Sequence, residues 1–203
     1  MAGGREMEFR LLVRGDRACF RRPEFAGDLV SYDVITPLAA REVFEAIYTT
    51  PGLCWRIDEI HVLAPLRWTW MALAKVECGA DLPAIAAGRR DRRMAHVLCD
   101  VAYVITGHTE PASDDVAQVF RDRAASGRFG RPPVLGHRSF PAEITLLEAD
   151  DAPPPGAWAN SGAVDLGWML YDAEADAGPR FFRPTMIDGV IDLRRRESLI
   201  LAG

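Results

Sequence analysis

The hydrophobic and polar positions near the start of the chain predict a strand followed by a helix. Residues 8–16 are rich in apolar and β-prone side chains and end at a Gly-Asp break, which is typical of a strand. After a second β-like run at 29–35, Thr36 suits the N-cap of a helix and Pro37 suits its first position. The helix should end before Pro51, and helical spacing gives it one buried stripe, formed by Ala40, Val43, Phe44 and Ile47.

The middle of the chain continues with two strands, a hairpin and a second helix. Apolar positions alternate over 55–63, which favours a half-buried strand, and residues 94–106 form a longer β-prone run. Between them, residues 64–93 are interpreted as a projecting hairpin, or thumb, which starts with Trp-Thr-Trp and ends in arginines. A helix is expected from Ser113 through Ala125, ended by Gly127. The resulting order β-α-β-β-α-β predicts an α+β domain with a ferredoxin-like fold.

The last quarter of the chain is predicted to form a smaller β region. A possible strand at 142–148 completes the first domain, which spans 1–148. Acidic residues and prolines then indicate a linker at 149–160, followed by the C-terminal β region at 161–203. Within this region, the Asp188-Gly189 pair lies between two β-like runs and predicts a tight hairpin.

Composition excludes several classes of protein. With 203 residues and 49% hydrophobic residues, the chain can build a real core, so general disorder is excluded. No apolar run reaches the roughly 20 residues that a membrane-spanning helix needs, and the first residues do not resemble a signal peptide. We therefore expect a cytoplasmic protein with no membrane partner. The four cysteines lack the spacing of a zinc site or a disulfide framework, so neither metal nor cofactor is expected.

Charge argues against a protein that coats nucleic acid indiscriminately. The formal net charge is −5, whereas general affinity for nucleic acid comes from neutralising many phosphates at once. Lys75 is the only lysine, and the arginines gather at 10–22, 89–93 and 194–196. Such clusters suit bidentate phosphate contacts, but they also occur on solvated faces and in proteins from GC-rich genomes. Composition alone therefore leaves RNA binding open.

Several strings in a fixed order carry a resemblance to a known family. They extend over most of the chain, and the order is more specific than any one string. The chain resembles the CRISPR-associated Cas5 family, subtype I-C. The strings are Gly15-Asp16-Arg17-Ala18-Cys19-Phe20, Arg22-Pro23-Glu24, Val30-Ser31-Tyr32-Asp33-Val34-Ile35-Thr36-Pro37, Glu45-Ala46-Ile47-Tyr48, Ile60-His61-Val62-Leu63, Asp100-Val101-Ala102-Tyr103-Val104-Ile105, Phe140-Pro141-Ala142, Asp165-Leu166-Gly167-Trp168-Met169-Leu170-Tyr171-Asp172, Phe181-Phe182-Arg183 and Asp188-Gly189-Val190-Ile191.

The resemblance implies a fold, a role and a set of partners. The fold would be a ferredoxin-like domain of the RRM type, as in repeat-associated RNA-binding proteins, with a thumb hairpin and a small C-terminal β region. Family members hold the repeat-derived 5′ handle of the guide RNA in the type I Cascade complex, beside its backbone subunit and its large subunit. Target DNA would be met indirectly, through the complex. Candidate RNA-binding residues combine cations for phosphates with one ring for stacking; they are Arg14, Arg17, Arg21, Arg22, Tyr32, Arg41 and Lys75.

Members of subtype I-C usually also cut precursor RNA without a metal, and here the chain departs from the family. Resemblance places a catalytic aromatic residue at Tyr48, although a tyrosine at a helix end is also an ordinary structural residue. The family's Lys-His pair is replaced by Asp115-Val116, which can neither neutralise a phosphate nor exchange a proton near neutral pH. His108 and His137 are weaker substitutes without a demanding spacing.

Three hypotheses remain open on the sequence. The first, which the loss of the Lys-His pair favours, is a handle-binding subunit of Cascade without nuclease activity. The second is a metal-independent endoribonuclease that processes precursor CRISPR RNA through Tyr48 and substitute partners. The third is an unrelated α+β interaction domain, which the ordered strings disfavour.

Overall fold

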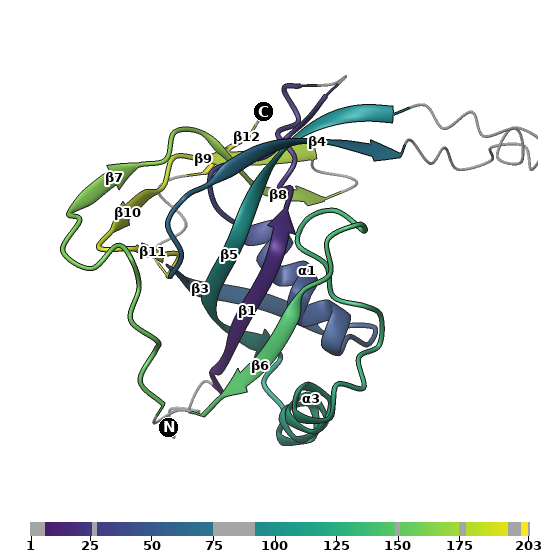
Figure 1. Ribbon diagram of the computed structural model, residues 1–203. Coiled ribbons are helices and arrows are strands. Elements are labelled where there is room, and N and C mark those ends of the chain that lie inside the picture. Colours follow the sequence, from purple (N-terminus) through teal and green to yellow (C-terminus); the bar gives the residue numbers. More distant parts are fainter. Residues whose placement is uncertain are drawn as a thin grey trace, which may run out of the picture.

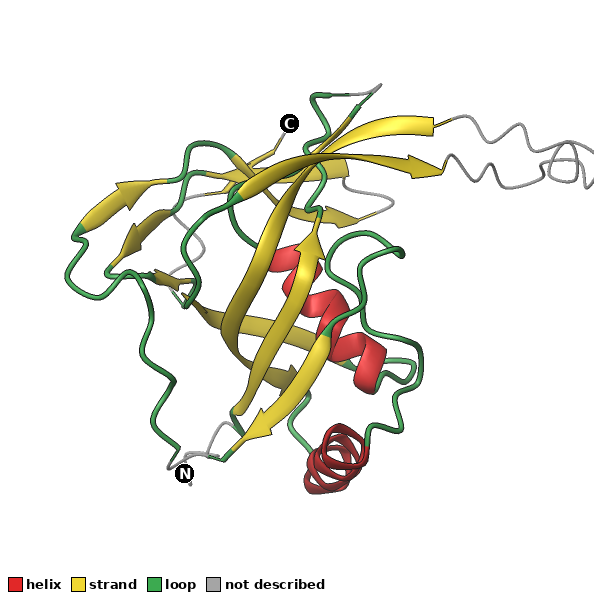
Figure 2. Cartoon of the chain, viewed as in Figure 1, coloured by secondary structure: helices red, strands yellow, loops and turns green. Residues whose placement is uncertain are grey.

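The computed structural model describes residues 7–25, 28–74, 92–148, 151–174, 178–194 and 200–202. Within these residues there are one large curved sheet, a smaller three-stranded sheet and two helices on one face of the large sheet (Figures 1 and 2). The expected α+β fold is confirmed. No helix in these ranges is long and apolar enough to span a membrane.

The centre of the large sheet has the strand order β6-β1-β5-β3, and each neighbouring pair is antiparallel. Helix α1 connects β1 to β3 and helix α3 connects β5 to β6, so these elements follow one another in the predicted order β-α-β-β-α-β. The elements are β1 (Phe9–Ala18), α1 (Pro37–Ile47), β3 (Cys54–Val62), β5 (Arg92–Glu110), α3 (Asp114–Ser126) and β6 (Glu143–Leu147).

Helix α1 begins and ends as its sequence predicts. The Thr36 hydroxyl accepts a hydrogen bond from the Ala39 backbone N–H at 3.2 Å, and Pro37 occupies the first turn, where its missing N–H costs nothing. The apolar stripe at Ala40, Val43, Phe44 and Ile47 is buried. The helix ends at Tyr48, which has an extended backbone.

Helix α3 has a different pair of caps. Ser113 is the N-cap residue but makes no side-chain capping bond, and Asp114 and Asp115 lie in the first turn, where negative charge is favourable. Gly127 ends the helix with a φ of 68°, a left-handed conformation that glycine adopts without strain.

Strands β4 and β5 form a hairpin that extends away from the body of the fold (Figure 1). Strand β4 (Trp68–Ala74) pairs with β5 from Trp68 opposite Leu98 to Ala74 opposite Arg92. This hairpin begins within the predicted thumb at 64–93. The remainder of that segment, including the candidate residue Lys75, lies outside the described residues.

The β-like run at 29–35 is mostly not a strand. The strand in this run is β2 (Leu29–Val30), which pairs with β5. Ser31 still donates its N–H to His96 O at 3.0 Å, and the residues after it leave the sheet. Tyr32 donates its backbone N–H to Phe20 O at 2.8 Å, and Tyr32, Val34 and Ile35 are buried. The apolar residues of this run therefore fill the core from a loop, which explains why they resemble a strand in sequence.

The C-terminal strands are divided between the two sheets. Strands β11 (Val190–Asp192), β10 (Thr185–Ile187) and β7 (Ala163–Asp165) continue the large sheet beyond β3. Strands β8 (Met169–Glu174), β9 (Gly178–Phe182) and β12 (Ile200–Ala202) form the small sheet.

The Asp-Gly hairpin between β10 and β11 is confirmed. Asp188 and Gly189 have φ values of 49° and 85°, and a two-residue turn with both φ values positive matches the twist of the strands that it joins. The run that precedes it is interrupted between β9 and β10, because the chain passes from the small sheet to the large one.

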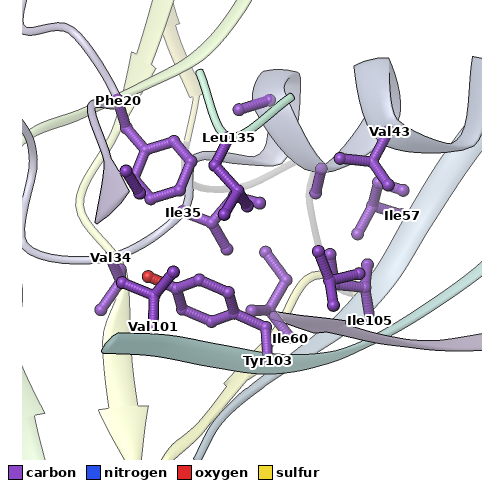
Figure 3. Packing of buried hydrophobic residues seen from close by; sticks show 14 of the residues in the cluster. Phe20, Val34, Ile35, Val43, Ile57, Ile60, Val101, Tyr103, Ile105 and Leu135 are labelled. Carbon is purple, nitrogen blue, oxygen red and sulfur yellow. The ribbon is translucent and has the colours of Figure 1, made fainter. Parts of the chain in front are cut away.

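The core lies between the helices and the large sheet. Val43 of α1 points toward Ile57 of β3 and Ile105 of β5, while Phe20 and Leu135 close the region near Tyr103 (Figure 3). An aromatic cluster joins both helices to the sheet: the Trp55 ring centroid lies 5.1 Å from that of Phe44 and 4.6 Å from that of Phe120. Both helices are thus fixed to the same face.

Candidate nucleic-acid interface

Three of the candidate arginines lie along the last part of β1 and just after it. Arg14 is exposed and has no side-chain partner among the residues that the structure describes. Arg17 is half-buried and donates from Nη1 to the neighbouring Asp16 carbonyl at 2.6 Å, while Arg21 is exposed. Arg14 and Arg17 are three positions apart in β1, so their side chains leave opposite faces of the strand. A phosphate chain that passes around the end of β1 can therefore meet positive charge from all three residues.

Arg22 and Tyr32 bind each other instead of offering a free ring. The Arg22 guanidinium lies 4.6 Å from the centroid of the Tyr32 ring, and its Nε donates to Ser31 O at 3.3 Å. Tyr32 is 1% exposed, and its hydroxyl accepts a hydrogen bond from Leu170 N at 3.2 Å. Burial raises the pKa of this hydroxyl. This buried position favours a structural role for Tyr32 over the expected stacking surface.

Arg41 forms a partly buried ion pair with Asp172. Its Nη1 and Nη2 donate to the two carboxylate oxygens of Asp172 at 2.8 and 2.7 Å, and Arg180 binds the same carboxylate at 2.9 Å. A guanidinium held in this way stabilises the packing of α1 against β8. Its geometry favours a structural role over the expected contact with RNA.

Tyr48 lies beside a cation that the sequence did not reveal. Its backbone carbonyl accepts a hydrogen bond from Trp55 Nε1 at 2.8 Å, which fixes the C-terminal end of α1. The Arg123 guanidinium of α3 lies 4.8 Å from the centroid of the half-buried Tyr48 ring and donates to Ile47 O at 3.4 Å. Nothing in the local pattern of α3 marks Arg123, because its partner belongs to another helix.

The two candidate histidines do not join Tyr48. His108 of β5 lies opposite Arg56 of β3, and paired residues share a face of the sheet. Arg56 follows Trp55 in the strand, so Arg56 and Trp55 point to opposite faces. Since Trp55 packs on the helix-covered face, His108 lies on the other face, where its Nδ1 is 2.7 Å from an Asp58 carboxylate oxygen.

His137 lies near the opposite end of α1 from Tyr48. It follows Gly136, whose loop approaches Cys19 and the N-terminal half of α1. Its Nδ1 accepts the Ser139 N–H at 3.2 Å, and burial, with help from the nearby charge of Arg138, lowers its pKa. Tyr48 and its two candidate substitute partners, His108 and His137, therefore occupy three separate places.

Asp115 and Val116 are in the first turn of α3, as the sequence predicts. Asp115 is exposed and Val116 is half-buried. Arg123 follows Asp115 about two turns later, roughly 12 Å along the helix axis. The cation beside Tyr48 thus comes from a different part of α3 than Asp115 and Val116, where the resemblance places the Lys-His pair of the family.

An exposed aromatic strip lies on one face of the β4–β5 hairpin. Trp68 and Trp70 are 40% and 60% exposed, and both point to the face that carries His96. The His96 ring centroid is 4.7 Å from that of Trp70, and its plane is within 11° of the plane of Trp68. Exposed rings on a projecting hairpin are suited to base stacking. The Trp-Thr-Trp alternation already signals this face in the sequence.

Comparison with known families decides the family of the chain. The Cas5d family model, described as a CRISPR-associated protein (Cas_Cas5), matches residues 9–194. The chain belongs to the Cas5 family.

Two curated relatives support this membership. The chain is 39% identical over 212 residues to a protein of Mannheimia succiniciproducens named CRISPR pre-crRNA endoribonuclease Cas5d, with 91% of this chain and 93% of the relative covered. A protein of Thermus thermophilus with the same name is 36% identical over 174 residues, covering 80% of this chain and 72% of the relative.

Solved structures show the same fold at lower identity. A crystal structure titled as a CRISPR-associated protein matches this Cas5 chain with a TM-score of 0.75 and 19% identity, covering 96% of this chain and 95% of the other. A functionally uncharacterized protein from Streptococcus mutans matches with a TM-score of 0.68 and 21% identity, covering 96% and 95%.

Proposed function

We propose that this Cas5 chain is the CRISPR RNA-binding subunit of a type I Cascade complex, subtype I-C, and holds the repeat-derived 5′ handle of the guide RNA for antiviral defence. The observation that carries the proposal is family membership over residues 9–194. Arg14, Arg17 and Arg21, together with the aromatic strip of Trp68, Trp70 and His96, supply the two chemistries that single-stranded RNA requires.

The proposal includes a ferredoxin-like, RRM-type fold for the RNA-binding domain. The order β1-α1-β3-β5-α3-β6 and the antiparallel strand order β6-β1-β5-β3 support it. We assign this domain to residues 1–148, with a thumb at about 64–93, a linker at 149–160 and a C-terminal β region at 161–203. In this arrangement, the thumb carries the aromatic strip away from the body of the protein.

The partners follow from the same role. The chain would bind guide RNA directly, contact the Cascade backbone subunit and large subunit in the cytoplasm, and meet target DNA through the complex. Holding RNA requires neither a metal nor a cofactor.

A second candidate function is metal-independent cleavage of precursor CRISPR RNA. The relatives are named endoribonucleases, and the Arg123 guanidinium beside Tyr48 offers a cation for a crowded phosphate. Against this, Asp115 and Val116 replace the family's Lys-His pair, and neither His108 nor His137 lies with Tyr48. We therefore favour binding without cleavage.

The test is a repeat-RNA assay in EDTA, in which retained complex and cleaved product are read from the same labelled molecule. We expect repeat-specific retention with intact RNA. Site-specific cleavage that is lost in Tyr48→Phe, but kept in the matched control Tyr171→Phe, would establish the nuclease instead. Equal affinity for repeat and unrelated RNA would overturn handle binding itself.

A further inference from the structure

A cavity of about 480 Å³ opens between the end of β1 and the N-terminal half of α1. Phe20, Leu38 and Leu170 give it apolar walls, while Arg21 and Glu42 are its two charged side chains. Its volume is within the range of small-ligand sites, which commonly combine apolar walls with a few polar groups. Tyr48 is at the other end of α1, so the cavity is separate from the residues considered for RNA cleavage.

Gly136 lines the cavity at a point where two backbone segments are in close contact. This residue has a φ of 75°, and a Cβ atom there would lie 2.3 Å from the Cys19 carbonyl oxygen. Cys19 also donates its N–H to Leu135 O at 3.1 Å, which holds the loop against the end of β1. The contact between the two backbones therefore forms part of the cavity before any ligand arrives.

The two charged residues differ in what they can recognise. Glu42 is half-buried; burial raises the pKa of its carboxyl, and the charge of Arg131 opposes the rise. In either protonation state, Glu42 can accept a hydrogen bond from an amino group. Arg21 is exposed at the edge of the cavity, close in sequence to Arg14 and Arg17, and can bind a phosphate oxygen.

We propose that this cavity holds one unstacked nucleobase of the bound RNA, a base that carries an exocyclic amino group, as cytosine and adenine do. The apolar walls contact the faces of the base, Glu42 accepts the amino hydrogen, and Arg21 binds the adjoining phosphate. The inference rests on the proposed RNA-binding function and adds a base-specific subsite to it.

The experiment uses the full chain and a series of repeat RNAs in which each handle nucleotide is made abasic in turn. For the wild-type protein, we expect one position where removal of the base weakens binding by about 10-fold. Leu38→Trp should fill the cavity, weaken binding of intact RNA by a similar factor and make binding insensitive to that abasic position. Ala125→Trp, an exposed site on α3, is the matched control and should behave as wild type.

A second variant tests the recognition of the amino group without filling the cavity. Replacing the identified base by its counterpart with a carbonyl in place of the amino group should weaken binding to wild type but not to Glu42→Leu. Unaltered RNA binding by Leu38→Trp, or an unchanged response to the abasic position, would overturn the subsite while leaving handle binding intact. Failure of the wild-type protein to bind any repeat RNA would overturn both.

Discussion

Asp172 shows how a single residue can connect distant parts of the chain. Its side chain is 3% exposed, and it receives hydrogen bonds from Arg41 of α1, Arg180 of β9 and its neighbour Ala173. Burial alone would raise the pKa of this carboxyl, but the hydrogen bonds and charge of Arg41 outweigh burial and hold its pKa below the ordinary 3.8. Asp172 therefore stabilises the packing of the small sheet against α1.

We expect Asp172→Asn to lower the free energy of unfolding by about 3 kcal/mol at neutral pH, because it leaves two partly buried guanidinium groups without their charge partner. Since the pKa is depressed in the folded state, this stability is present above pH 3.8 and is lost as pH falls through the lower folded-state value. Urea unfolding should therefore show a smaller difference between wild type and variant at low pH than at pH near 7. A difference that does not change with pH would contradict this account.

The exposed pair of Asp165 and Arg183 provides the control. Both side chains are more than half exposed, so water already solvates them in the folded state. Asp165→Asn should change the free energy of unfolding far less than Asp172→Asn does, because an exposed ion pair contributes little to stability. An equal loss of unfolding free energy in Asp172→Asn and Asp165→Asn would mean that burial does not determine how much these ion pairs stabilise the fold.

At the scale of elements, the two helices provide a matched comparison of N-caps. Thr36 makes a capping hydrogen bond to Ala39 N, whereas Ser113 makes none. We expect Thr36→Ala to cost about 1 kcal/mol of stability and Ser113→Ala clearly less, measured by thermal or urea unfolding. Equal effects would indicate that the Ser113 hydroxyl caps α3 in solution.

The β4–β5 hairpin carries a prediction about RNA. Trp70 is the most exposed ring of the aromatic strip, and stacking on one ring contributes about 1–3 kcal/mol per base. Trp70→Ala should therefore weaken repeat-RNA binding by about 10-fold in fluorescence anisotropy and leave thermal stability nearly unchanged. Trp168→Ala removes a ring that is 48% exposed outside the hairpin and should leave RNA affinity unchanged. Equal losses in the two variants would remove the strip from the interface.

For the whole molecule, the sequence predicted the elements better than it predicted the site. Caps and turns are local, so Thr36, Gly127 and the Asp188-Gly189 turn could be read directly. Arg41 looked like a cation available for RNA because its partner, Asp172, is 131 residues away in the chain. The burial of Tyr32 and the contact of Arg123 with Tyr48 could not be predicted for the same physical reason. Burial and pairing between distant segments leave no periodic pattern in the sequence.

Charge at this scale sets how RNA affinity should depend on salt. The protein carries a net charge of −5, and the candidate RNA-binding cations at the end of β1 are Arg14, Arg17 and Arg21. If about three phosphates are bound, the slope of log affinity against log salt should be about −2, because each contact with single-stranded RNA contributes about −0.7. Arg14→Ala should make that slope shallower by about 0.7, while Arg183→Ala, a surface arginine paired with Asp165, should not change it. Anisotropy titrations between about 50 and 300 mM salt measure the slope, and a value steeper than about −5 would require a broad cationic surface instead of a local grip on the handle.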